Sequence, residues 1–207
     1  MTGKLQTVYK ANSTEAQKLA YDEWAGEYER DLLSQGYTLP SQCATLFAAF
    51  VSERRGPFLD AGCGTGMQLE PLHMAGFRGF TGIDLSMGML SIARRKGMHD
   101  ELFQATMGER LPFEDSQFNA TLTCGAITQG HAPAKSFDEL IRVTKSGGLI
   151  VFTLRCDDGI NHSYADRLSE LLHEGCWRVI YESTPRITFP LGEETHIQHK
   201  GWVFEVV

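Results

Sequence analysis

The segment that most constrains the fold is the run FLDAGCGTG at residues 58–66, which is followed by Gly82-Ile83-Asp84. Phe58 and Leu59 are typical of the end of a short buried strand, and the glycines after them permit a tight turn on which a ligand can lie directly against the backbone. Residues 67–75 have the pattern of a helix. The run therefore predicts a strand, a turn and a helix N-terminus, which together form the nucleotide-binding corner of an α/β sheet.

The residues around this turn indicate which nucleotide it suits. The glycines at 62, 64 and 66 miss the G-x-G-x-x-G pattern of dinucleotide-binding proteins by one position, and no Lys or Arg lies between Asp60 and Arg78. A carboxylate beside the turn repels a pyrophosphate but attracts the ammonium and sulfonium groups of S-adenosylmethionine. Asp84 ends the second strand, where a carboxylate can accept hydrogen bonds from both ribose hydroxyls. The pattern favours S-adenosylmethionine over NAD, which makes an NAD oxidoreductase a distant alternative.

These motifs are similar to those of a known family. Residues 60–66 resemble the D-x-G-x-G-x-G first motif of class I S-adenosylmethionine-dependent methyltransferases, and Asp84 resembles their ribose-binding acid. Residues 111–118 (LPFEDSQF) resemble the family's L-P-F-x-D-x-x-F segment, and residues 142–148 (RVTKSGG) its R-V-L-K-P-G-G turn. Several motifs in the family's order are more specific than one glycine pattern. Residues 21–28 (YDEWAGEY) and 125–133 look closest to the methyltransferase-like proteins named for the Williams-Beuren region.

The resemblance and the hydrophobic pattern imply an α/β fold, namely a Rossmann-like, doubly wound, mostly parallel seven-stranded sheet with a C-terminal antiparallel hairpin and an N-terminal helical lid. We expect one domain over 1–207, with lid helices in 1–55 and the core in 56–207. Asn12 and Glu15 predict a capping box for a helix to Leu33, and a second helix spans 41–51. Strands are expected at 57–60, 79–84, 101–105, 119–124, 149–154, 177–187 and 201–207. Helices are expected between each two of the first five strands. After the fifth strand we expect a polar turn at 157–159 and a helix over 163–174.

The resemblance also implies a set of cofactor contacts. Asp60 orients the turn and attracts the methionyl ammonium, and Asp84 binds the ribose. Relatives commonly carry Asp at the position of Met107, so we expect weaker cofactor binding here, with the Gly108 amide left to face the adenine. The full set of predicted cofactor-binding residues is Tyr21, Tyr28, Asp60, Ala61, Gly62, Gly64, Gly66, Asp84, Leu85, Met89, Met107, Gly108 and Gly125.

One face of the first long helix carries an aromatic stripe. Tyr21, Trp24 and Tyr28 follow one another at helical spacing, and such a stripe fits a lid over the cofactor and ordinary core packing equally well. The neighbouring Asp22 and Glu23 are expected to face solvent. Both interpretations of the stripe stay open.

The methyl acceptor is expected to enter along residues 125–131, beyond the fourth strand. His131 is the candidate general base because imidazole titrates near neutrality, although a loop histidine is more often polar surface. Arg155 could pair with an acidic acceptor or cap the end of the sheet. His196 and His199 lie three apart on an expected strand and so point to opposite faces, and no metal site is predicted.

Composition narrows the function classes further. The chain has 207 residues, a net charge of −7, no basic cluster suited to a nucleic acid, and five cysteines without a C-x-x-C pair. With no expected membrane span or signal pattern, we expect a cytoplasmic protein with reduced thiols. The leading hypothesis is an S-adenosylmethionine-dependent methyltransferase that acts on a small molecule and releases S-adenosylhomocysteine. The alternatives are a protein methyltransferase and a noncatalytic domain that binds the cofactor or its product. The oligomeric state stays open.

Overall fold

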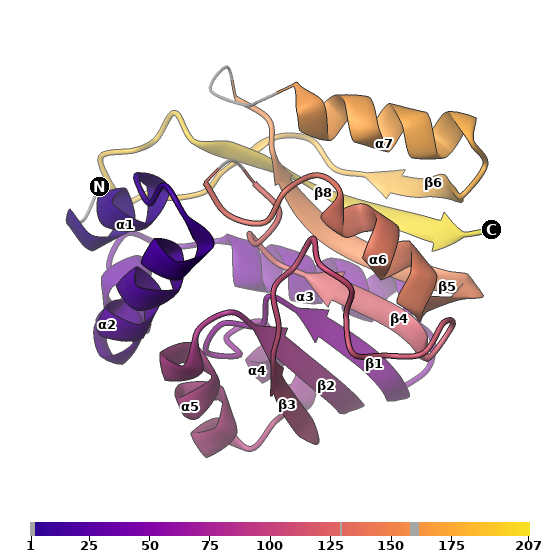
Figure 1. The fold of residues 1–207 in the computed structure, drawn as a ribbon, viewed down its shortest axis with the longest axis horizontal. Coiled ribbons are helices and arrows are strands. Elements are labelled where there is room, and N and C mark those ends of the chain that lie inside the picture. The colour runs from indigo at the N-terminus through magenta and orange to yellow at the C-terminus, as the bar shows by residue number, and fades with distance from the viewer. Residues whose placement is uncertain (1–2, 129, 158–161) are drawn as a thin grey trace.

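The computed structural model describes residues 3–128, 130–157 and 162–207. These residues form helices and strands that alternate along much of the chain (Figure 1). The helices are α1 (Gly3–Tyr9), α2 (Thr14–Leu33), α3 (Leu39–Phe50), α4 (Leu69–Met74), α5 (Met87–Lys96), α6 (Ser136–Val143) and α7 (Ser163–His173). The strands are β1 (Arg55–Ala61), β2 (Arg78–Asp84), β3 (Glu101–Gln104), β4 (Phe118–Thr123), β5 (Thr144–Arg155), β6 (Trp177–Glu182), β7 (Arg186–Ile187) and β8 (Gln198–Val206).

The strands form one mixed sheet in the order β3-β2-β1-β4-β5-β8-β6, with the short β7 also paired to β8. Strands β1 to β5 pair in parallel, whereas β8 runs antiparallel to both β5 and β6. The predicted Rossmann-like fold and its antiparallel C-terminal strands are confirmed. The predicted count of seven strands is one short, because the long C-terminal arm divides into β6 and the two-residue β7.

Local capping explains where several helices begin and end. Ser86 accepts a hydrogen bond from the Met89 amide at the start of α5, as predicted, and Gly97 ends that helix in the left-handed conformation. At the start of α2 the cap is Ser13, which accepts from the Ala16 amide, rather than the predicted Asn12. The side-chain oxygens of Asn and Ser can both cap a helix, so the sequence pattern locates the start of the helix only to within one or two residues.

Two other expectations were wrong. Helix α1 was not predicted, although its Leu5 and Val8 are buried three residues apart on one side of the helix. Conversely, the expected helix between β3 and β4 does not form, and the described residues 105–117 make an irregular connection. Gly108 and Ser116 adopt positive φ angles of 90° and 55° there, which a helix cannot accommodate. Of the predicted turn at 157–159, Asp158 and Gly159 lie outside the described residues.

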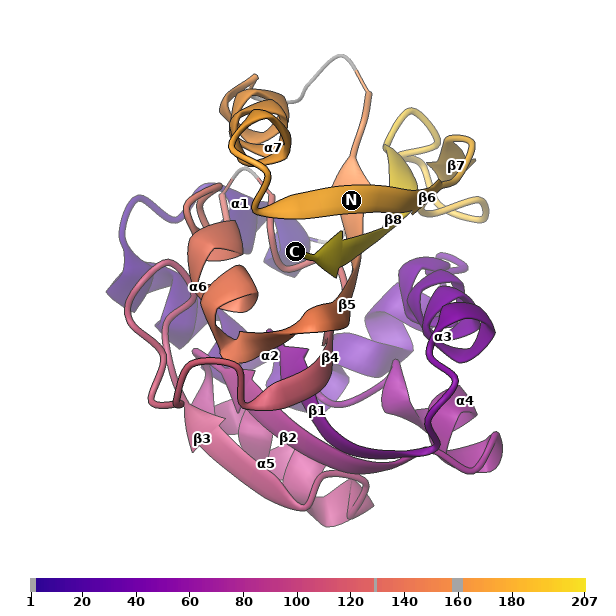
Figure 2. The same ribbon diagram turned by 90° about the vertical axis from the view of Figure 1, so that its right-hand side faces the viewer.

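Two layers of helices enclose the sheet, with α3 and α4 on one side and α6 and α7 on the other (Figure 2). The first layer is built around four fully buried aromatic rings. Phe47 of α3 lies 5.3 Å from Phe58, 5.4 Å from Phe77 and 5.6 Å from Phe80 between ring centroids. This cluster fixes α3 against the central strands β1 and β2.

The N-terminal helices lie beyond the carboxyl ends of the parallel strands (Figure 1). They have their own hydrophobic cluster, in which Trp24 and Leu32 of α2 pack with Phe189 and Ile197 from the C-terminal arm. Helix α2 is therefore anchored to a segment that precedes β8. Among the described helices none is long and apolar enough to cross a membrane.

Truncating the centre of the aromatic cluster should be costly. We expect Phe47→Ala to lower the free energy of unfolding by about 3–5 kcal/mol, because it removes a fully buried ring and leaves a cavity. Urea denaturation followed by circular dichroism measures the change. Met74→Ala, at a side chain that is 91% exposed, is the control and should change stability by less than about 0.5 kcal/mol. A loss below about 1 kcal/mol for Phe47→Ala would contradict this account of the core.

Candidate active site

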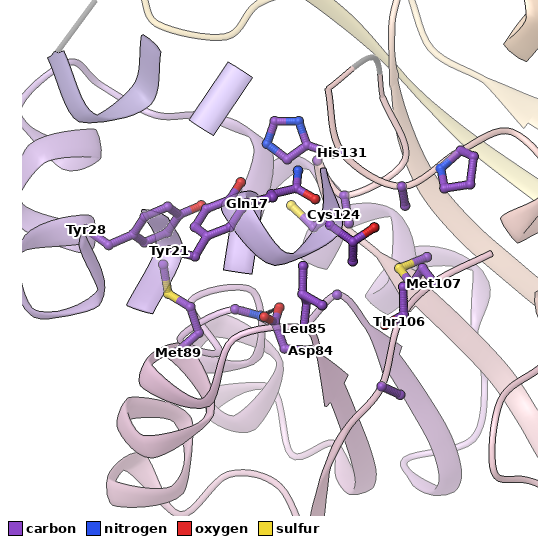
Figure 3. A pocket seen from close by; sticks show the side chains of 18 residues that line it. Gln17, Tyr21, Tyr28, Asp84, Leu85, Met89, Thr106, Met107, Cys124 and His131 are labelled. Carbon is purple, nitrogen blue, oxygen red and sulfur yellow. Dashed lines mark hydrogen bonds between the residues drawn. The ribbon is translucent and has the colours of Figure 1, made fainter. Parts of the chain in front are cut away.

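A cavity opens where the strand order reverses, between β1 and β4 at the carboxyl ends of the strands. Ligands of open α/β sheets bind at this point. The space inside it is about 770 Å³, counting the open solvent at its mouth. Its lining residues are Thr14, Gln17, Tyr21, Tyr28, Gly62, Gly64, Asp84, Leu85, Met89, Ala105, Thr106, Met107, Cys124, Gly125, Ala126, His131, Ala132 and Pro133 (Figure 3).

The turn after β1 exposes its backbone to this cavity. Gly62 and Gly64 have φ angles of 69° and 53°, a conformation that side chains rarely adopt. A Cβ atom built on Gly62 would lie only 2.4 Å from the Cβ of Ala126, whereas one on Gly64 would meet nothing within 4 Å. Gly62 is therefore required for the close approach of two loops, and Gly64 leaves open space beside the backbone.

Asp84 joins this turn to the start of α5. Its carboxylate accepts hydrogen bonds from the Gly64 amide at 2.8 Å and the Ser86 amide at 2.9 Å. Burial raises the pKa of Asp84 to about 6, although the two backbone hydrogen bonds lower it, and the nearby carboxylates of Asp60 and Asp22 add to the increase. The side chain faces the cavity from its floor (Figure 3).

Asp60 does not line the cavity and is completely buried. Its carboxylate accepts from Gln68 Nε2 at 2.8 and 3.0 Å and contacts His99 Nε2 at 3.0 Å. The same Gln68 amide also donates to the Cys63 carbonyl at 3.0 Å, so Asp60 orients the turn through Gln68. The predicted attraction of a cofactor ammonium to Asp60 stays a prediction.

Helix α2 docks on the N-terminus of α5 through Asp22. Its carboxylate accepts from Ser86 Oγ at 2.5 Å and from the Gly88 amide at 2.8 Å, and it pairs with Lys18 at 3.3 Å. Burial acts to raise the pKa of Asp22, but the bonds from Ser86, Gly88 and Lys18 outweigh it and hold that pKa below its usual value. The expectation that Asp22 faces solvent was therefore wrong. A second link joins Lys96 of α5 to Glu29 of α2 at 2.5 Å.

The aromatic stripe of α2 is divided between the cavity and the core. Tyr21 and Tyr28 line the cavity, whereas Trp24 is 1% exposed and packs in the cluster with Leu32. The Tyr21 ring lies 5.8 Å from the imidazole of His131 between centroids, so α2 and the loop after β4 meet over the cavity (Figure 3).

The structure brings most of the predicted cofactor residues together. Those at the cavity are Tyr21, Tyr28, Gly62, Gly64, Asp84, Leu85, Met89, Met107 and Gly125, together with the candidate base His131. Those away from it are Asp60, Ala61, Gly66 and Gly108. Ala61 is fully buried in the core, Gly66 faces His99, and Gly108 packs on Pro133.

Sequence reasoning missed several lining residues. Gln17 lies one turn before Tyr21 on the same face of α2, and Thr14 lies two turns before it. This spacing could have identified both residues. Cys124 could have been found as the residue directly after β4. Thr106 has no comparable signal, because it lies in the irregular connection that was expected to be helical.

The predicted acceptor segment is only partly at the cavity. Gly125, Ala126 and His131 line it, whereas Ile127 and Thr128 are buried elsewhere and Gln129 lies outside the described residues. Arg155 binds Asp157 with two hydrogen bonds of 2.7 and 2.8 Å, and it does not line the cavity.

His199 sits beside Arg155 in the sheet and is 3% exposed. Burial, with the nearby Arg155, lowers its pKa to about 3, and its Nδ1 lies 2.6 Å from Thr188 Oγ1. It is therefore a neutral core residue. The described residues contain no cluster of three metal-ligating side chains.

Comparison with known proteins agrees with this geometry. Residues 59–152 match the model of a family described as a methyltransferase domain. Human methyltransferase-like protein 27 is 35% identical over 164 residues, which cover 76% of this chain and 65% of that protein. Residues 59–152, which include the glycine turn and Asp84, therefore carry a methyltransferase domain. A methyltransferase-like relative is also the kind of protein to which residues 21–28 and 125–133 pointed.

Other relatives of this methyltransferase domain are more distant. The demethylmenaquinone methyltransferase of Renibacterium salmoninarum is 33% identical over 135 residues, which cover 63% of this chain and 55% of that protein. The chain thus spans less than two thirds of the length of both curated relatives. A solved structure with the same fold is the geranyl diphosphate C-methyltransferase of Streptomyces coelicolor A3(2), in complex with Mg²⁺, geranyl diphosphate and S-adenosyl-L-homocysteine. Its TM-score is 0.62 at 17% identity, and the match covers 87% of this chain and 84% of that chain.

The raised pKa of Asp84 predicts a pH-dependent stability for the methyltransferase domain. An aspartate in an unfolded chain has a pKa of about 3.9. Between that value and about 6, the folded state binds more protons than the unfolded state, so stability falls as pH rises through this window. The free energy of unfolding of Asp84→Asn minus that of wild type should increase from about pH 4 to about pH 6 and then stay constant. Urea titrations across this range measure the difference, and a difference that does not change with pH would contradict the assignment.

Proposed function

We propose that the protein is an S-adenosylmethionine-dependent methyltransferase that transfers a methyl group to a small-molecule acceptor and releases S-adenosylhomocysteine. The observation that carries the proposal is the Asp84 carboxylate beside the exposed Gly62–Gly64 turn in one cavity. The match of residues 59–152 to a methyltransferase domain and the S-adenosyl-L-homocysteine complex of a protein with the same fold support it.

The cavity fits this cofactor on its own geometry. The open space beside Gly64 admits a ligand against the turn, and the Asp84 carboxylate can accept ribose hydroxyls in addition to its backbone donors. Leu85, Met89 and Met107 would enclose the adenine, and Gly62 with Gly125 would border the methionyl part. When bound, S-adenosylmethionine supplies a methyl group that its sulfonium already activates.

The residues of this chain then contribute position and exclusion of water. Tyr21 and Tyr28 cover the cavity from α2, and we assign residues 1–55 the function of a lid on the core of residues 56–207, within a single domain. Holding a nucleophile in line with the methyl group can account for about 7–11 kcal/mol of barrier reduction. His131 borders the space above the turn and is our candidate to accept the proton of the acceptor.

The lining supports a small acceptor. Among the described cavity residues, Asp84 is the sole carboxylate, and neither Lys nor Arg is present. This composition disfavours phosphate-rich acceptors such as nucleic acids. The five free cysteines of the described chain fit a reducing compartment, and we propose the cytoplasm as the location.

A labelling experiment tests the proposal. The protein is incubated with methyl-labelled S-adenosylmethionine and a cell extract separated into small molecules, proteins and nucleic acids. We expect label in the small-molecule fraction and a loss of at least tenfold in Asp84→Ala, because the ribose contact is removed. Label in the protein fraction would favour a protein acceptor. Cofactor binding by calorimetry without transfer to any fraction would favour a noncatalytic binding domain.

The base assignment is tested separately on the labelled acceptor. His131→Ala should lower turnover by about 10²–10⁴-fold and remove the increase in rate near neutral pH. His131→Gln is the matched variant that keeps a polar side chain without a titrating group, and it should behave like alanine in the pH profile. Unchanged turnover and an unchanged pH profile in both variants would eliminate the role.

A further inference from the structure

Two of the five cysteines lie against each other behind the cavity. Cys43 of α3 is completely buried, and its thiol donates to the Thr123 carbonyl at 3.6 Å. The residue after Thr123 is Cys124, directly after β4, and its thiol is close enough to that of Cys43 to raise the pKa of Cys43. Both residues pack in the hydrophobic cluster between α3 and the sheet. The two sulfur atoms are therefore neighbours, although 80 residues separate Cys43 from Thr123 in the sequence.

Cys124 is the accessible member of the pair. Its side chain lines the cavity, where Figure 3 shows its sulfur between Gln17 and Leu85. It also lines a smaller adjoining pocket with Cys63, but the Cys63 thiol contacts the Gly64 carbonyl at 3.7 Å. A reagent that enters the cavity can thus reach Cys124, while Cys43 is shielded behind it.

We infer that Cys43 and Cys124 form a reversible disulfide when the protein meets a peroxide, and that this disulfide weakens cofactor binding. The second part rests on the proposed function. Protein disulfides in reducing compartments are usually transient and redox-sensing, which fits a pair placed at a ligand cavity.

The chemistry proceeds in two balanced steps. The Cys124 thiol gives up its proton, and its sulfur attacks one oxygen of hydrogen peroxide. The O–O bond breaks and the departing hydroxide takes up that proton, so the products are a sulfenic acid and one water. The sulfur of Cys43 then attacks the Cys124 sulfur, the S–O bond breaks, and a second water leaves with the remaining thiol proton. Two thiols are oxidised by two electrons and one peroxide is reduced to two waters.

The disulfide would move the wall of the cavity. Linking the sulfurs brings the two Cβ atoms to about 3.5–4.5 Å and draws Cys124 toward α3. Two residues further on, Ala126 abuts the Gly62 turn so closely that a Cβ built on Gly62 would lie 2.4 Å from the Ala126 Cβ. The displacement is therefore transmitted to Gly62, and the space for the cofactor changes.

The reactivity of the two thiols sets their order. Burial, together with the adjacent Cys124, raises the pKa of Cys43 well above its usual value, so this thiol stays protonated and unreactive toward peroxide. Cys124 consequently reacts first. A ligand that fills the cavity covers Cys124 and should protect the pair.

The test uses the full chain, with and without bound S-adenosylhomocysteine. After treatment with hydrogen peroxide, mass spectrometry should detect a peptide that links Cys43 to Cys124 in wild type and in the control Cys176→Ser, but not in Cys43→Ala or Cys124→Ala. Prior addition of S-adenosylhomocysteine should suppress the link. Calorimetry should show at least a tenfold loss of affinity for S-adenosylhomocysteine after oxidation, which a thiol reductant restores.

Several outcomes would overturn the inference. The first is oxidation of Cys124 without a link to Cys43, and the second is a link from Cys124 to Cys63. The third is a protein that carries the Cys43–Cys124 link but binds S-adenosylhomocysteine with unchanged affinity. If the reduced wild type does not bind S-adenosylhomocysteine at all, the proposed function and the effect on affinity both fail. Mass spectrometry detects the linked peptide whether or not the protein binds S-adenosylhomocysteine. It therefore still decides whether the disulfide between Cys43 and Cys124 forms.

Discussion

The arrangement of the site depends on one carboxylate at the end of β2. Asp84 accepts backbone hydrogen bonds from the turn after β1 and from the start of α5, and it holds two separate loops at a fixed distance. Because parallel strands end at one edge of the sheet, such a connection is possible only where β1 and β2 are neighbours. The glycine turn, the α5 N-terminus and the floor of the cavity are all positioned by this side chain. Burial at this position raises the pKa of the Asp84 carboxyl group.

Much of the fold could be predicted because its signals are local. The strands of the parallel sheet are short apolar runs that end at polar residues or glycine, and Ser86 is a direct cap for α5. The missing helix after β3 shows where local signals end. Residues 105–117 contain apolar positions compatible with a helix, but Gly108 packs against Pro133 from another part of the chain and turns the backbone away. That contact is tertiary and has no local signature.

The candidate site also contains residues that local sequence signals predict and residues that they do not. Motif spacing identified Asp84, Gly62 and Gly64 because the chemistry of a ligand fixes their types. The orientation of Asp60 could not be predicted, since it depends on Gln68 and His99, which reach it from a following turn and from another strand connection. The same holds for Asp22, whose partners Ser86 and Gly88 lie more than 60 residues away. Polar side chains with distant partners resemble surface residues in a sequence.

The position of Asp22 has a consequence for how freely α2 can move. This carboxylate is bound to the first turn of α5, so a displacement of α2 leaves the Gly88 amide without its acceptor. Loss of a capping contact typically costs about 1 kcal/mol, which corresponds to a factor of about five in a conformational equilibrium. The bonds from Ser86 and Gly88 to Asp22 therefore favour the observed position of α2 by about this factor over any arrangement in which they are lost, before any ligand enters.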